Sequence, residues 1–175
     1  MLYKVARNAI VGWESHRSRI IKAPFKTMME GITMNIIQCY SSTNDSKDDI
    51  KDQFYERLQS IIEKCPRNNL TSVMGDLNAK VGIDNTRYED IIGRHGLEER
   101  NENGERFENL CAFNRLVTGS TIYPRSCIHK ATCMSPHHIK EYQINHICIS
   151  EKFRRTMADV RSRRGADVAS GHHTT

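Results

Sequence analysis

Asp76 and Asn78, an acid and an amide two positions apart, are the leading candidates for a catalytic or ligand-binding site in this chain. They follow a short apolar run, Val73-Met74, and Gly75. Alternate residues of an extended segment point to the same side, so both side chains can address one ligand, such as a phosphate, a metal ion or an activated water. An Asx-rich turn after a buried strand is the alternative, because Gly, Asp and Asn are the usual turn residues.

Other polar side chains occur at predicted strand ends or in the loops just beyond them. They are Tyr40, Thr132, Asn145, His146, His172 and His173. In phosphodiester hydrolysis an Asp can orient or deprotonate water, Asn and Tyr can hold phosphate oxygens, and His can stabilise the transition state. Phosphoryl chemistry usually needs a divalent cation held by carboxylates, and Asp76 is the one obvious ligand here. A structural role is the favoured interpretation of His146, and Tyr40 as a half-buried strand-end aromatic is an alternative.

Length, charge and hydropathy set the class of protein. The 175 residues suggest one domain spanning 1–175, and 26 Lys and Arg against 21 Asp and Glu give a net charge of +5. This excess fits an anionic partner such as DNA. No signal peptide opens the chain, and no run approaches the roughly 18–20 apolar residues of a membrane span. We expect an intracellular protein, nuclear or cytoplasmic and not secreted, with no membrane partner and no small-molecule cofactor.

The six cysteines are scattered without a C-x-x-C pair, which indicates thiols of a reducing compartment rather than a disulfide framework. One group of residues resembles a metal site in composition: Cys127, His129, Cys133, His137 and His138. Its spacings match no standard zinc pattern, so we expect no zinc there.

Strands and helices interleave along the chain, which favours an α/β or α+β class with a layered sheet. The predicted strands span 19–23, 33–40, 70–74, 116–117, 121–123, 129–133 and 142–149. Pro24 should end the first strand, and a turn at 29–31 should join it to the second as a hairpin. The loop at 135–140 should join the last two strands in the same way.

Two helices are predicted. The first has Ser46 as its N-cap and Asp49 at the capping-box position, and it ends before Pro66. Its apolar face is formed by Ile50, Phe54, Leu58, Ile61 and Ile62. The second helix spans 105–114, with Asn103 as a candidate cap.

Several motifs, taken in order, carry a resemblance to a known family. They are Gln38-Cys39-Tyr40, Gly75-Asp76-Leu77-Asn78, His129-Lys-Ala-Thr132, Gln143-Ile-Asn-His-Ile147 and Gly165-Ala-Asp-Val-Ala-Ser-Gly-His172. On these residues the chain resembles the endonuclease/exonuclease/phosphatase superfamily, and most closely the endonuclease domains of non-LTR retrotransposons. Against the family pattern, the early segment with its metal-binding Glu and the final strand are absent. We therefore expect an incomplete domain, truncated at both ends.

The resemblance implies a two-sheet α/β sandwich flanked by helices that cleaves DNA with Mg²⁺. In this family pattern, Tyr40 contacts the phosphate, while Asp76 and Asn78 position the nucleophilic water and the scissile group. Asp76 is also the implied metal ligand. Thr132 corresponds to a substrate-binding hydroxyl beside the phosphate, and His172 to the residue that stabilises the transition state.

Departures from the family pattern fall on the same site. The family Asp that orients the catalytic His is Asn145 here, and a metal-side Asp is Gly171. An amide cannot stabilise imidazolium by charge, and glycine offers no ligand to a cation. A family Ala-Pro pair is replaced by Ser41-Ser42, and a family Trp by Cys133. We therefore predict a degraded retrotransposon-derived endonuclease with little or no activity.

Two other interpretations of the sequence stay open. The same fold could serve as a non-catalytic module that binds nucleic acid or a protein through its basic surface. The chain could also be an unselected reading frame that folds poorly, because exposed sheet edges invite aggregation.

Overall fold

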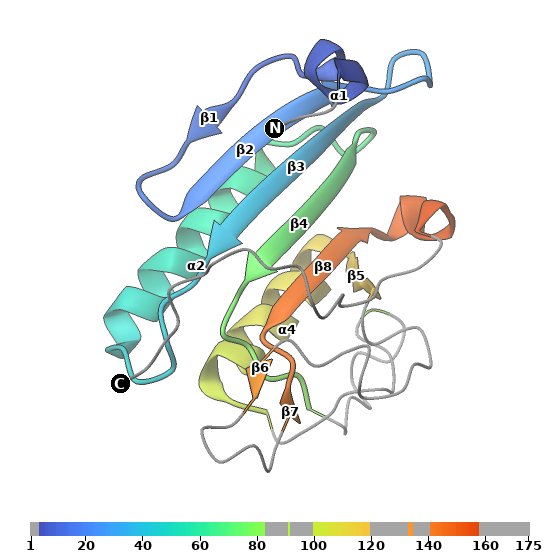
Figure 1. Ribbon diagram of the computed structural model, residues 1–175. Coiled ribbons are helices and arrows are strands. Elements are labelled where there is room, and N and C mark those ends of the chain that lie inside the picture. Colours follow the sequence, from blue (N-terminus) through green and yellow to red (C-terminus); the bar gives the residue numbers. More distant parts are fainter. Residues whose placement is uncertain (1–3, 83–90, 92–99, 120–132, 135–140, 158–175) are drawn as a thin grey trace.

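A six-stranded mixed sheet organises the chain (Figure 1). The computed structural model describes residues 4–82, 91, 100–119, 133–134 and 141–157. The strands of this sheet run in the order β1 (Glu14–Ser15), β2 (Ile20–Lys26), β3 (Thr33–Tyr40), β4 (Leu70–Asp76), β8 (Asn145–Ser150) and β5 (Leu116–Thr118). A separate two-stranded sheet pairs β6 (Cys133–Met134) with β7 (Glu141–Tyr142). The described helices are α1 (Lys4–Ala9), α2 (Asp48–Glu63), α4 (Glu102–Asn114) and the 3-10 helix η2 (Glu151–Thr156).

The core lies between the six-stranded sheet and two helices. In this sheet β3 and β4 run parallel, and the other neighbouring pairs are antiparallel. Parallel neighbours need a crossover connection, which α2 supplies. Figure 1 shows α2 and α4 on the same face of the sheet, which we call the helix face. Ile37 and Val73 are lateral partners on β3 and β4 and are fully buried, so the helix face carries the packed core.

The first helix forms largely as its apolar pattern predicts. Four of the five predicted apolar residues are buried: Phe54, Leu58, Ile61 and Ile62. Ile50 is 47% exposed, so its predicted place on the apolar face is wrong. The N-cap is Lys47, which makes no side-chain cap bond, rather than Ser46. Packing of the buried face therefore stabilises helix α2, although its first turn has no side-chain cap.

The second helix begins earlier than predicted. Its N-cap is Asn101, whose side chain accepts a hydrogen bond from the Gly104 N–H at 2.7 Å. The predicted cap, Asn103, is wrong, since this residue lies inside α4 and is fully buried. At the other end, Arg115 closes the helix in a left-handed conformation with φ 52°.

Strand β2 runs through Pro24 to Lys26, so the predicted strand end at Pro24 is wrong. The Pro24 carbonyl points away from β3 and accepts a hydrogen bond from the Val11 N–H at 2.8 Å. The Pro24 nitrogen faces the same outer side, beyond the end of β1, so its missing N–H removes no ladder bond. The predicted hairpin turn is confirmed: the Ile32 N–H donates to the Met29 carbonyl at 3.1 Å.

The last predicted strand, 142–149, is divided between two sheets. Strand β7 pairs with β6, as the predicted hairpin requires, with Cys133 opposite Tyr142. Strand β8 instead lies between β4 and β5 in the large sheet. The Ile144 carbonyl, at the break, accepts a hydrogen bond from the Leu77 N–H at 3.0 Å. This bond ties the break to the segment that follows β4.

The predicted α/β class is confirmed, with an open, layered arrangement of helices on a sheet. The assignment of 1–175 to a single domain stays a prediction. In the described part of the chain, no helix is both long and apolar enough to cross a membrane.

Candidate functional site

Three of the predicted site residues form one row across the sheet. Asp76, the last residue of β4, is the lateral partner of Tyr40 at the end of β3. On its other side, Asp76 is the partner of Asn145, the first residue of β8. Lateral partners in a sheet point to the same face. A phenol, a carboxylate and an amide therefore project from neighbouring positions of β3, β4 and β8. Figure 1 shows these three strands next to one another in the sheet.

The row faces away from the helices. Its neighbour in β8, His146, lies on the helix face, where its ring is 4.8 Å from the Phe107 ring of α4. Side chains alternate along a strand, so Asn145 and its row partners occupy the opposite face. Tyr40 is 47% exposed, Asn145 is exposed and Asp76 is half-buried, so a ligand in solution can reach the row.

Asn78 joins the row through a turn and not through an extended strand. It adopts a left-handed φ of 48°, and its N–H donates to Asp76 Oδ1 at 3.0 Å. This is the Asx turn that the sequence offered as an alternative, and it lies within the site. The Asn78 Nδ2 donates to the Ser41 carbonyl at 3.1 Å, which links the segments that follow β3 and β4.

Gly75 is required by a close approach beside the row. Its φ is +143°, and an added Cβ would lie 1.9 Å from the Cys39 carbonyl oxygen. Both features exclude a larger residue at this position. The glycine therefore sets the spacing of β3 and β4 immediately before Tyr40 and Asp76.

His146 is placed as a structural residue. It is 1% exposed, and its Nε2 is 2.7 Å from the Ala79 carbonyl, so Nε2 carries the proton and donates. Burial lowers the pKa of His146 to about 4, although the bond to Ala79 opposes this shift. The imidazole is therefore neutral at pH 7 and turned away from the row.

Two curated relatives cover nearly the whole chain. The craniofacial development protein 2 of Bos taurus is 33% identical over 169 residues, which are 97% of this chain and 28% of the relative. The protein of the same name from Tragulus javanicus is 32% identical over 169 residues, covering 97% and 29%. The chain thus spans less than a third of the curated relatives it matches. No protein-family model matches the chain.

Solved structures show the fold more widely. The endonuclease domain of TRAS1, a telomere-specific non-LTR retrotransposon, matches with a TM-score of 0.54 and 11% identity, over 82% of this chain and 57% of that one. An AP endonuclease from Archaeoglobus fulgidus matches with a TM-score of 0.52 and 15% identity, over 83% and 59%. D. rerio TDP2, solved with a single-strand DNA product, matches with a TM-score of 0.51 and 8% identity, over 81% and 52%. The chain has the endonuclease/exonuclease/phosphatase fold. The resemblance drawn from its motifs is confirmed.

Part of the predicted site falls on residues beyond those described. Thr132, Gly171, His172 and His173 belong to this group, as do all members of the Cys/His cluster except Cys133. Within the described ranges, no group of three or more His, Cys, Asp or Glu side chains could hold a metal ion. The roles of Thr132 and His172 in an endonuclease/exonuclease/phosphatase site stay predictions.

Most of the described cysteines belong to the packed interior of the chain. Four of them, Cys39, Cys65, Cys111 and Cys148, are free and buried. Burial raises the pKa of Cys39 to about 12, and the thiol on the helix face is therefore unreactive.

The serine pair that replaces the family Ala-Pro is buried between the row and α4. The Ser41 N–H donates to the Asp76 carbonyl at 2.8 Å, so Ser41 continues the contact between β3 and β4. The Ser42 Oγ is buried and finds no hydrogen-bond partner in the part of the chain that the structure describes. This is the position at which the family pattern has proline, which carries no hydroxyl.

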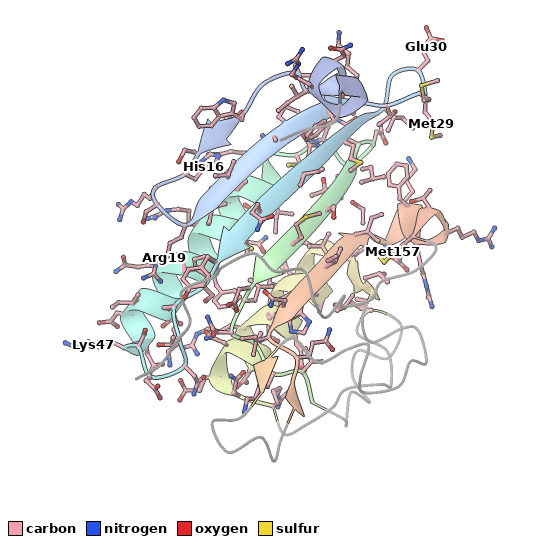
Figure 2. The ribbon with its side chains drawn as sticks, in the orientation of Figure 1. His16, Arg19, Met29, Glu30, Lys47 and Met157 are labelled. Carbon is pink, nitrogen blue, oxygen red and sulfur yellow. The ribbon has the colours of Figure 1, made fainter. Side chains whose placement is uncertain are left out.

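Two residues near the site were missed by the sequence interpretation. The exposed Arg19 precedes β2, and its carbonyl accepts a hydrogen bond from the Tyr40 N–H at 2.9 Å, which brings a cation to this end of the sheet (Figure 2). Asn101, the cap of α4, donates from Nδ2 to the Asn78 carbonyl at 2.9 Å. The sequence predicts Arg19 as the first residue of a strand and so gives it no role in the site. It contains two asparagines near the start of α4, and the sequence pattern favours Asn103 over Asn101 as the cap.

Proposed function

We propose that this chain is a phosphodiesterase-type DNA endonuclease domain, derived from a non-LTR retrotransposon, that has lost most of its catalytic power. The observation that carries this proposal is the row of Tyr40, Asp76 and Asn145, joined by Asn78 through the Asx turn. These side chains suit a phosphodiester: a phenol and an amide for phosphate oxygens, and a carboxylate for the attacking water. The fold shared with the TRAS1 endonuclease domain supports the same class of protein.

In this proposal each residue has a stated role. Asp76 orients and deprotonates the attacking water, and its own orientation is set by the Asn78 N–H. Tyr40, at the exposed end of β3, donates a hydrogen bond from its hydroxyl to a phosphate oxygen. His172 stabilises the transition state, and Thr132 binds the substrate beside it. Asn145 can orient a neutral His172, but it cannot stabilise the imidazolium by charge, which is the first cause of weak activity.

The described residues do not fit a Mg²⁺ site. Asp76 is the one carboxylate in the row, and its lateral partners are a phenol and an amide. A divalent cation needs several oxygen ligands, with carboxylates supplying the charge. We expect Mg²⁺ to bind weakly at Asp76, which is the second cause of weak activity.

The proposal predicts little or no nicking of supercoiled plasmid DNA by the wild-type chain with Mg²⁺. Restoring both family acids with Asn145→Asp and Gly171→Asp should raise the nicking rate by about tenfold or more, since losing an orienting Asp alone costs up to ~10⁴ in rate. Adding Asp76→Ala to the restored chain should abolish nicking. Gel electrophoresis of the plasmid forms measures all of these rates.

Asp49→Ala is the matched control, because Asp49 is an exposed acid on α2 away from the row. It should leave the nicking rate unchanged. Robust nicking by the wild-type chain that Asp76→Ala abolishes would overturn the claim of lost activity. A restored chain that still nicks no DNA would count against the assignment of the row.

A second candidate function is a non-catalytic module that binds nucleic acid or a protein. The net charge of +5 and the exposed Arg19 beside Tyr40 favour it. Phosphate contacts need no catalytic carboxylate, so DNA binding should fall with salt and should survive Asp76→Ala. Arg19→Ala should lower the slope of log affinity against log salt by about one. Fluorescence anisotropy with a labelled oligonucleotide at several salt concentrations measures both effects.

A further inference from the structure

The first turn of α4 contacts both segments that carry the site. We call these segments the site loops: residues 41–44, which follow β3, and residues 77–82, which follow β4. Gly104 brings the helix against the second loop, since an added Cβ would lie 2.0 Å from the Lys80 carbonyl oxygen. The fully buried Asn103 reaches the first loop, where its Nδ2 donates to the Ser42 carbonyl at 3.0 Å.

Asn101 makes three hydrogen bonds at this junction. Its Oδ1 accepts from the Gly104 N–H at 2.7 Å, which is the ordinary bond of a helix N-cap. The same oxygen accepts from the Lys80 N–H at 2.9 Å. Its Nδ2 donates to the Asn78 carbonyl at 2.9 Å. Capping uses the oxygen alone, so the bond from Nδ2 serves the loop and not the helix.

The bond from Nδ2 restrains the residue that orients Asp76. Asn78 is held at a φ of 48°, a conformation that an L-residue adopts at some cost unless its surroundings fix it. In this conformation the Asn78 N–H reaches Asp76 Oδ1 at 3.0 Å. A chain of two hydrogen bonds therefore runs from Asn101 through Asn78 to the carboxylate of the row.

We propose that Asn101 is a positioning residue of the site, which holds Asn78 and, through it, the carboxylate of Asp76. The proposal deepens the function proposed above and rests on it for the chemistry of Asp76. It goes beyond capping, for which Asp and Ser would serve as well as Asn. The site is thereby assembled from three separate parts of the chain: the ends of β3 and β4 and the start of α4.

Asn101→Asp separates the two roles. Aspartate keeps the acceptor for Gly104 and Lys80, but it removes the donor and sets a carboxylate oxygen against the Asn78 carbonyl. The thermal midpoint should fall only by the amount that one lost hydrogen bond accounts for, because Asp still caps the helix. The Asn78 amide signal in the NMR spectrum should shift, and its hydrogen exchange should become about tenfold faster.

Asn101→Ser is the second variant, because serine also caps but is too short to reach Asn78 and adds no charge. It should produce the same effect on the Asn78 amide. The matched control is Asn114→Asp at the other end of α4, where Nδ2 donates to the Leu110 carbonyl at 2.8 Å. This control should leave the Asn78 amide unchanged. An unchanged Asn78 amide in a folded Asn101→Ser chain would overturn the proposal.

A second measurement separates this proposal from the function on which it rests. In the chain restored with Asn145→Asp and Gly171→Asp, Asn101→Ser should lower the plasmid nicking rate at least about tenfold, as one lost positioning contact can. A restored chain that nicks no DNA while Asn101→Ser still shifts the Asn78 amide would sink the proposed function alone. Nicking that Asn101→Ser leaves untouched would sink the positioning role alone.

Discussion

Gly75→Ala should destabilise the chain by about 4 kcal/mol or more, from the combined costs of a strained backbone and of overpacking. The added Cβ would lie 1.9 Å from the Cys39 oxygen and 2.9 Å from the Cys39 carbonyl carbon, and a φ of +143° disfavours any L-residue. Backbone atoms of a central strand cannot move aside as a flexible side chain could. Typical domains have ~5–15 kcal/mol of stability, so much of the variant should be unfolded. Urea unfolding followed by circular dichroism measures the loss.

Two other glycines separate the cost of the backbone conformation from the cost of the steric clash. Gly31 has a φ of +73°, and an added Cβ there would meet nothing within 4 Å, so Gly31→Ala should cost about 1–2 kcal/mol for the left-handed backbone alone. Gly12 also has open space and no left-handed φ, so Gly12→Ala should be nearly neutral. A loss in Gly75→Ala no larger than that in Gly31→Ala would show that β3 and β4 do not approach as described.

Acidification should destabilise the chain through His146. The pKa of the buried imidazole is about 4, below the ~6.5 of an unfolded chain, because burial disfavours the charged form. The unfolded chain therefore binds a proton in this interval that the folded chain excludes. The contribution of His146 is fully present above pH ~6.5 and is lost as the pH falls toward 4, by about 3 kcal/mol in total. The free energy of unfolding from urea titrations at several pH values measures it.

His146→Gln is the variant that isolates this effect. Glutamine has a side-chain N–H that can donate to the Ala79 carbonyl, but it does not titrate. The variant should lose the part of the pH dependence that lies between pH 4 and 6.5, whatever its stability at pH 7. Equal slopes in wild type and His146→Gln would refute the role assigned to the buried ring.

The sequence predicts those helices and strands whose apolar pattern lies within one continuous segment. The sequence predicts strand β3 with the bounds that the structure shows, because residues 33–40 form a run rich in apolar residues between Gly31 and a polar loop. The apolar spacing of α2 likewise identified its buried face, apart from Ile50 at the exposed first turn. Both depend on periodicity within one segment, which a sequence displays directly.

Three predictions are wrong because the structure at those residues depends on a partner that is distant in the sequence. Asn103 has the position of a cap in the sequence, but its side chain donates a hydrogen bond to the carbonyl of Ser42, which is remote in sequence. Pro24 looks like a strand end, yet it lies on the side of β2 where no ladder bond is needed. The segment 142–149 reads as one strand, and the bond from Leu77 to Ile144 marks where it divides. In each case a contact with another element overrides the local preference.

For the site, the residue types follow from the sequence: an acid, two amides and a phenol occur in the order of a phosphodiesterase family, with Asn145 in place of an acid. How these residues meet depends on the fold. Strand register placed Tyr40 and Asn145 on either side of Asp76, and Asn101 restrained Asn78 from a third part of the chain. Register depends on packing the whole sheet against α2 and α4, because a slip of one residue would turn every side chain of a strand to the other face.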